Sequence, residues 1–120
     1  MKQAERYIDE QLRALAHDGQ VHVVHDKDQK YTLSYIIEGV TPSYLIVHSG
    51  IAFCNIAAGD NFCKSEGRTY SKRRVLEQVN RGSNHAHFSK TLIIERVKTV
   101  PSSAAEWRKL DNIVTGALAP

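Results

Sequence analysis

The sequence has little cysteine and no long apolar segment. Its two cysteines, Cys54 and Cys63, lie nine residues apart without a second pair. This spacing argues against a zinc ribbon and favours two reduced thiols over a disulfide. No apolar run approaches the roughly 20 residues that a transmembrane helix needs, and the N-terminus is charged and amphipathic, unlike a signal peptide. We therefore expect an intracellular, cytoplasmic protein without a membrane partner.

Motifs of several enzyme classes are also missing. The chain has no Walker A, GxGxxG or HExxH motif. Asp26, Asp28 and Glu38 fall at expected turns and strand ends, where acidic residues are common in any protein. His85 and His87 have the spacing of an extended metal-binding pair, but no acidic or cysteine partner is close in sequence. We expect no enzymatic activity, no catalytic residues, no cofactor and no metal.

The composition is that of one globular domain. The chain has 120 residues, of which 42% are hydrophobic and 24% are charged, so it can bury a core without disulfides. A formal net charge of +3 makes it mildly basic, which permits an anionic partner without demanding one. We predict a single α+β domain over residues 1–120.

Hydrophobic periodicity and turn residues predict seven elements in the order α-β-β-β-α-β-α. They are helices over 2–17, 61–80 and 103–115, and strands over 21–25, 30–38, 44–53 and 88–97. Ser103 and Glu106 form a capping box for the last helix, whose apolar face is Trp107, Leu110 and Val114. The expected fold is a small four-stranded sheet, mixed or antiparallel, with about three helices. A parallel pairing of the last two strands is allowed, because a helix connects them.

The second expected helix is basic along one stripe, because Lys64, Arg68 and Lys72 recur every four residues. Gly67 costs about 1 kcal/mol relative to alanine inside a helix, and one use for it is the close approach of a backbone or a ligand. Arginine forks match phosphate, and aromatic rings stack on bases, so this segment suits a nucleotide. The predicted ligand-binding residues are Phe62, Lys64, Arg68, Tyr70, Lys72 and Arg74. The alternative interpretation is a solvated basic face that binds nothing.

Residues 49–74 resemble a pattern found in small proteins of phage genomes. The pattern is a strand with a small residue and a cysteine, then Asp-x-Phe-x-Lys, then Gly-Arg and another arginine six residues later. The matching residues are Gly50, Cys54, Asp60, Phe62, Lys64, Gly67, Arg68 and Arg74. The chain departs from the pattern in the longer, proline-free stretch 55–59. It also has Tyr70 and Ser71 where an aliphatic residue and an alanine are usual.

On these residues, about a quarter of the chain, the protein looks similar to the phage Thoeris anti-defence sponge family. The resemblance implies a non-enzymatic protein that sequesters cyclic ADP-ribose-type signals in the host cell cytoplasm. Some members also hold cyclic oligonucleotides, and they assemble as oligomers. The partner expected from the resemblance is an anionic, nucleotide-type small molecule.

Two other functions stay open, a protein that binds double-stranded RNA or DNA and a protein inhibitor of a host factor. The order helix-strand-strand-strand-helix over 2–80 is that of a double-stranded-RNA-binding domain, in which a basic cluster at the start of the second helix contacts phosphates. Here the cations at 72–74 lie further along that helix. An exposed apolar patch, for example around Trp107, would instead favour a protein inhibitor of a host factor. We also expect a homo-oligomer, because the amphipathic helices over 2–17 and 103–115 can pack on a second subunit.

Overall fold

Seven elements follow one another along the chain. The computed structural model describes residues 2–26, 30–53, 64–82, 88–95, 101 and 103–118. The elements are α1 (Lys2–Leu15), β1 (His22–Asp26), β2 (Tyr31–Val40), β3 (Tyr44–Phe53), α2 (Lys64–Arg81), β4 (Ser89–Glu95) and α3 (Ala104–Leu118). The predicted α+β class and the order α-β-β-β-α-β-α are confirmed.

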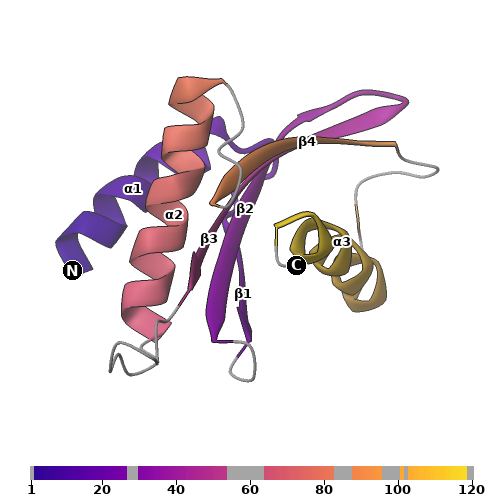
Figure 1. Ribbon diagram of the computed structural model, residues 1–120. Helices are drawn as coiled ribbons and strands as arrows, with labels where there is room; N and C mark the ends of the chain where they lie inside the picture. The colour runs from indigo at the N-terminus through magenta and orange to yellow at the C-terminus, as the bar shows by residue number, and fades with distance from the viewer. Residues whose placement is uncertain are drawn as a thin grey trace.

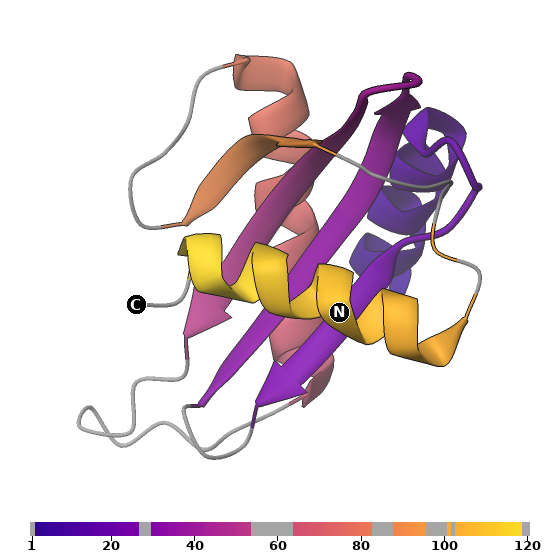
Figure 2. The ribbon, with the colours of Figure 1, turned by 90° about the vertical axis from the view of Figure 1, so that its right-hand side faces the viewer.

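The sheet lies between two helical layers (Figures 1 and 2). Its strand order is β1-β2-β3-β4, with α1 and α2 on one face and α3 across the other. All three strand pairings are antiparallel, so the parallel alternative for β3 and β4 is wrong. Ser89 pairs with Gly50 and Glu95 with Tyr44, so β4 begins beside the second half of β3. The helical connection permits a parallel pair but does not impose one.

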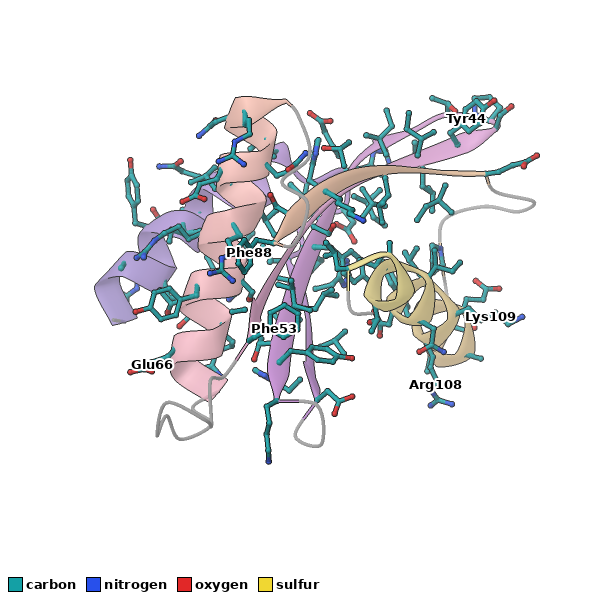
Figure 3. All side chains as sticks on the ribbon, viewed as in Figure 1. Tyr44, Phe53, Glu66, Phe88, Arg108 and Lys109 are labelled. Carbon is teal, nitrogen blue, oxygen red and sulfur yellow. The ribbon has the colours of Figure 1, made fainter. Side chains whose placement is uncertain are left out.

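Alternation along β2 and β3 divides the apolar core between the two faces of the sheet. The α3 face buries Tyr31, Leu33, Tyr35, Ile37, Leu45, Val47, Ile51, Leu110, Val114 and Leu118. The opposite face buries Ile8, Leu12, Ile36 and Val75 in a smaller cluster. The apolar face predicted for the last helix is confirmed, because Leu110 and Val114 are buried and Trp107 packs against their cluster. Arg108 and Lys109 are exposed on the solvent side of α3 (Figure 3).

α3 is held by its N-cap and by a stack of aromatic rings. The Glu106 N–H donates to Ser103 Oγ at 3.2 Å, and the Trp107 N–H donates to the Ser103 carbonyl at 3.0 Å. The helix start predicted at Ser103 is therefore confirmed. The Trp107 ring stacks on His22, with 4.2 Å between centroids, and His22 lies 5.0 Å from the ring of Tyr35. Trp107 thus docks α3 on β1 and is half-buried, which does not fit an exposed patch centred on it.

Two glycines let α2 pack closely on the sheet. A Cβ atom at Gly50 would lie 2.6 Å from the Ser71 carbonyl oxygen and 2.8 Å from the Val75 nitrogen. A Cβ atom at Gly67 would overlap the side chain of Thr32 on β2. A close approach does occur at Gly67, but the group that approaches is the Thr32 side chain of the sheet and not the expected backbone or ligand. The side of α2 that carries Gly67 is covered by the sheet, so only the other sides of α2 are available for a ligand.

Candidate functional site

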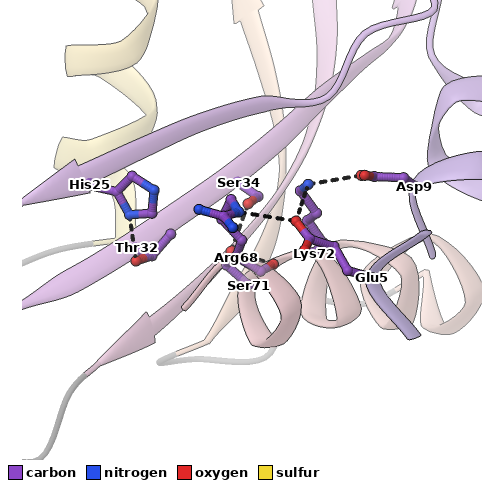
Figure 4. Close-up of polar contacts among 8 residues, drawn as sticks. All are labelled: Glu5, Asp9, His25, Thr32, Ser34, Arg68, Ser71 and Lys72. Atoms are coloured by element: carbon purple, nitrogen blue, oxygen red, sulfur yellow. Dashed lines mark hydrogen bonds and ion pairs between the residues drawn. The ribbon is translucent and has the colours of Figure 1, made fainter. Parts of the chain in front are cut away.

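The basic stripe predicted on α2 faces α1 (Figure 4). Arg68 Nε donates to Glu5 Oε1 at 3.1 Å, and Lys72 Nζ donates to the same oxygen at 2.9 Å. Lys72 Nζ also lies 2.9 Å from Asp9 Oδ1, as an ion pair without hydrogen-bond geometry. Only 7% of the Lys72 side chain is exposed, so its charge is neutralised within the fold. Arg68, whose side chain is 37% exposed, still reaches solvent.

Glu5 is the acidic centre of this cluster. Burial by itself raises the pKa of the Glu5 carboxyl, but hydrogen bonds and charges from Lys72 and Arg68 outweigh burial and lower this pKa below its ordinary value of 4.5. Glu5 is therefore ionised at neutral pH and joins the first turn of α1 to the second and third turns of α2. The main role of the cluster is therefore to pack α1 against α2, and any role in ligand binding is secondary.

Arg74 is bound to the sheet. Its Nη1 atom donates to the backbone carbonyl of Ile51, and its guanidinium lies 4.3 Å from the ring centroid of Phe88. Burial lowers the pKa of Arg74, and the charge of Glu77 opposes that shift. Arg74 therefore joins α2 to β3 and to the residue before β4. Substituting Arg74 or Arg68 changes packing as well as charge, so neither is a clean test of ligand binding.

Tyr70 does not share the stripe of Arg68 and Lys72. It is 44% exposed on the outer side of α2, and the Arg73 guanidinium lies 5.5 Å from its ring centroid. Lys64 is the first residue of α2, but its side chain and the whole of Phe62 lie outside the described part of the chain. Among the predicted residues with described side chains, Arg68 and Lys72 face α1, Arg74 contacts the sheet and Tyr70 reaches solvent, so these four do not gather around one point.

The start of β2 lies beside the start of α2, at the bottom of Figure 1. Thr32, the second residue of β2, touches Gly67 in the first turn of α2. α1 runs alongside α2 in the same direction, because Glu5 contacts Arg68 and Lys72, whereas Leu12 belongs to one cluster with Val75, further along α2. The start of α1 therefore lies beside the second and third turns of α2.

Three cations with described side chains lie on these segments. Lys30 has a φ of 60° and immediately precedes β2, Arg68 reaches solvent from the second turn of α2, and Arg6 is exposed on α1. We call Arg6, Lys30 and Arg68 the basic end. Glu66 is also exposed in the first turn of α2, so the positive charge of the basic end is interrupted.

A buried polar chain links α2 to β3 and β4. Ser89 Oγ donates to Gln78 Oε1 at 2.9 Å, and Gln78 Nε2 donates to Thr91 Oγ1 at 2.9 Å. Thr91 Oγ1 lies 2.8 Å from His48 Nδ1, and His48 Nε2 lies 2.7 Å from Glu38 Oε2. A carboxylate oxygen accepts, so His48 Nε2 is the donor of the last bond. The only sign of this chain in the sequence is the spacing of Ser89 and Thr91, which places both on one face of β4.

The members Glu38, His48 and Thr91 have the order of acid, base and hydroxyl in a hydrolytic triad. Two observations favour a structural role. Thr91 Oγ1 already accepts a hydrogen bond from Gln78, and only 8% of His48 is exposed. We interpret the chain as the polar part of the α2–sheet interface, where every buried polar group needs a partner.

Within the described ranges, no group of three or more His, Cys, Asp or Glu side chains is placed to hold a metal ion. Both cysteines and the His85–His87 pair lie outside the described residues, so the sequence-based predictions about them stay predictions. In the same part of the chain, none of the helices has the length and apolar character needed to cross a membrane.

Comparisons with known proteins supply no relative. No family model, no curated protein and no solved structure matches this chain. The resemblance to the anti-defence sponge family stays a prediction, and we infer the function from the geometry of the described residues.

Proposed function

We propose that this protein binds double-stranded RNA through the basic end, without chemical conversion of the RNA. The observation that carries the proposal is the parallel packing of α1 and α2 on one face of the sheet, with the start of β2 beside the first turn of α2. Proteins recognise A-form duplexes largely by shape, through contacts with phosphates and 2′-hydroxyls. A rigid surface built from two parallel helices and the start of a strand suits such a regular ligand.

The basic end supplies groups that bind phosphate. The start of a helix favours an anion, because its backbone N–H groups and its dipole point toward that end. Arg68 follows the first turn of α2, and Lys30 immediately precedes β2, whose second residue touches that turn. If the three cations of the basic end each contact one phosphate, log affinity should fall with log salt at a slope of roughly −2 to −3.

A closed pocket on the predicted stripe is less well supported by the contacts. Lys72 is neutralised by Glu5 and Asp9, and Arg74 binds the Ile51 carbonyl. Holding a diphosphate with these two cations would require breaking contacts that already satisfy them. An extended duplex needs only cations that are exposed.

Fluorescence anisotropy with a labelled duplex tests the proposal. The probe is an RNA duplex of about 16 base pairs, titrated at salt concentrations between about 50 and 200 mM. We expect Arg6→Gln and Lys30→Gln each to weaken binding to all duplex sequences and to reduce the salt slope by about 1. Lys109→Gln is the matched control, because Lys109 is exposed across the sheet on α3 (Figure 3). Absence of binding at micromolar protein and low salt, or an equal effect of Lys109→Gln, would refute the proposal.

Sequestration of a nucleotide-type signal in the host cytoplasm is the second proposal. The exposed pair of Tyr70 and Arg73 favours it, because an aromatic ring beside a guanidinium can stack on a base and bind a phosphate. Calorimetry with cyclic ADP-ribose isomers and cyclic di- and trinucleotides should show micromolar binding that depends weakly on salt, with recovery of the intact ligand. Tyr70→Ala should abolish that binding. No heat of binding with any of these ligands, or unchanged affinity in Tyr70→Ala, rejects this alternative.

A further inference from the structure

β4 presents an apolar edge to solvent. Of the strands that the structure describes, β1 and β4 are the outermost in the sheet, and Figure 2 shows β4 in orange at one side. Ile93, in the middle of β4, is 69% exposed, the largest value among the exposed large hydrophobic residues of the described chain. Edge strands usually carry a charge, a proline or a bulge at such a position. An isoleucine there indicates a partner strand.

The strand register shows which backbone groups of β4 point outward. The Ile51 N–H donates to the Phe88 carbonyl at 2.9 Å, and the register between β3 and β4 then continues without a shift. Hydrogen-bonded and non-hydrogen-bonded pairs alternate in an antiparallel ladder, so the even-numbered residues of β4 bond to β3. Ile93 and Glu95 therefore direct their N–H and C=O groups away from β3, toward the edge.

We propose that β4 pairs in antiparallel fashion with β4 of a second copy of this chain, around a two-fold axis at Ile93. In this register Ile93 faces Ile93 of the second copy, Leu92 faces Ile94, and Thr91 faces Glu95. Within residues 91–95, apolar residues then pair across the centre, and no like charges lie opposite each other. The two four-stranded sheets become one continuous sheet with an isologous interface. This inference does not depend on either proposed function.

Other symmetric registers fit the side chains of β4 less well. A two-fold axis at Leu92 places Lys90 opposite the apolar Ile94 of the second copy. An axis at Ile94 places Ile93 opposite Glu95, and an axis at Glu95 brings two carboxylates together. Each of these loses the central isoleucine pair or opposes a charge to an apolar or like-charged residue. The segment TLIIE, residues 91–95, is therefore complementary to itself in one register.

The surface beside β4 favours the same partner. Ile46 on β3 is the register partner of Ile93, and Tyr44, two residues before Ile46, is 48% exposed. Figure 3 shows Tyr44 at the end of the sheet that projects beyond α1 and α2. A two-fold axis perpendicular to the sheet keeps the same face upward in both copies, so the two apolar strips join. α1 and α3 bury their apolar faces within the chain, which favours β4 over the terminal helices as the site of oligomerisation.

Cysteine cross-linking tests the register directly. Opposed residues of a hydrogen-bonded antiparallel pair have Cα atoms about 5.5 Å apart, within disulfide range. In a Cys54→Ser, Cys63→Ser background, Ile93→Cys should form a covalent dimer on mild oxidation. Ile113→Cys is the matched control, because Ile113 is an exposed isoleucine on α3, at 51%, and should remain monomeric on a non-reducing gel. Failure of Ile93→Cys to cross-link, or equal cross-linking of both variants, overturns the proposal.

Light scattering after size exclusion provides a second test, which needs no engineered cysteine. Across a series from micromolar to millimolar protein, the native chain should approach twice its mass of 13.5 kDa. Ile93→Lys should remain at the mass of one chain, with an unchanged circular dichroism spectrum, while Ile113→Lys should dimerise normally. A native protein that stays monomeric at every concentration overturns the proposal. A dimer that dissociates with Ile113→Lys and persists with Ile93→Lys overturns it as well, and assigns the interface to α3.

Discussion

Replacing Gly50 with alanine places a methyl group where α2 packs most closely on β3. The new Cβ would lie 2.6 Å from the Ser71 carbonyl oxygen, and 2.8 Å from both the Val75 nitrogen and the Arg74 Cβ. Ordinary contact begins at 3.4 Å, so α2 must withdraw by roughly 0.6 to 0.8 Å to relieve the overlap. Two of the three atoms belong to the helix backbone, so a change of rotamer cannot remove the clash.

The magnitude follows from two opposing effects. Overpacking a well-packed interface costs about 1 to 3 kcal/mol, and the withdrawal of α2 also stretches the buried hydrogen bond of 2.6 Å between Ser34 and Ser71. Alanine restricts the unfolded chain relative to glycine, which returns about 0.4 to 1 kcal/mol. We therefore expect Gly50→Ala to lower the free energy of unfolding by about 1 to 2 kcal/mol.

Gly116→Ala is the matched control, with the opposite sign. Gly116 lies within α3, and a Cβ atom there would meet nothing within 4 Å. Alanine is favoured over glycine inside a helix by about 1 kcal/mol, so Gly116→Ala should stabilise the protein by about that amount. Urea denaturation followed by circular dichroism measures both variants. If Gly50→Ala unfolds at the same or a higher urea concentration than the native protein, the close packing of α2 on β3 is wrong.

Two further substitutions test buried polar contacts. Glu5→Gln keeps the shape of the side chain but removes the charge that Lys72 and Arg68 require, so it should destabilise the protein by about 1 to 3 kcal/mol at pH 7. Because the folded pKa of Glu5 lies below its ordinary value of 4.5, this difference should shrink as pH falls through and below that value. Unfolding curves that keep the same separation at pH 7 and pH 3 contradict the ion cluster. Tyr35→Phe removes the hydroxyl that donates to Asp111 Oδ1 at 2.5 Å, and it should cost about 1.5 to 3 kcal/mol in urea denaturation. Burial and Asp111 raise the pKa of Tyr35 above its ordinary value of 10.0, so the native protein should lose stability above that pH, and Tyr35→Phe should lose less. An equal loss in both proteins contradicts the burial of this hydroxyl.

Local patterns in the sequence determined most of the fold. The stretch 44–53 is predicted as a strand with the bounds that β3 has, because its apolar and β-branched residues suit a strand packed on both faces. The capping signal at Ser103 and the spacing of Leu110 and Val114 are likewise local, and both are confirmed. Such signals depend on residues a few positions apart, so they can be recognised without knowledge of the tertiary structure.

Local sequence patterns could not determine the direction in which β4 pairs with β3. The sequence allowed β4 to run parallel or antiparallel to β3, because the helix between them is long enough for either connection. The observed antiparallel register depends on how the chain is placed after α2 has packed on the sheet. The polar chain from Ser89 to Glu38 has the same origin, since its members come from four elements.

The candidate site shows most clearly what the sequence determines and what depends on the tertiary structure. Helical spacing by itself determined that Arg68 and Lys72 share one stripe of α2, and the structure has them at one carboxylate. Only the tertiary structure decided that this stripe faces α1, where Glu5 and Asp9, more than sixty residues earlier in the chain, neutralise Lys72. Periodicity states which residues lie side by side, but it does not state what packs against them. For that reason the sequence predicted a basic helix, and the fold determined which of its cations remain available to a partner.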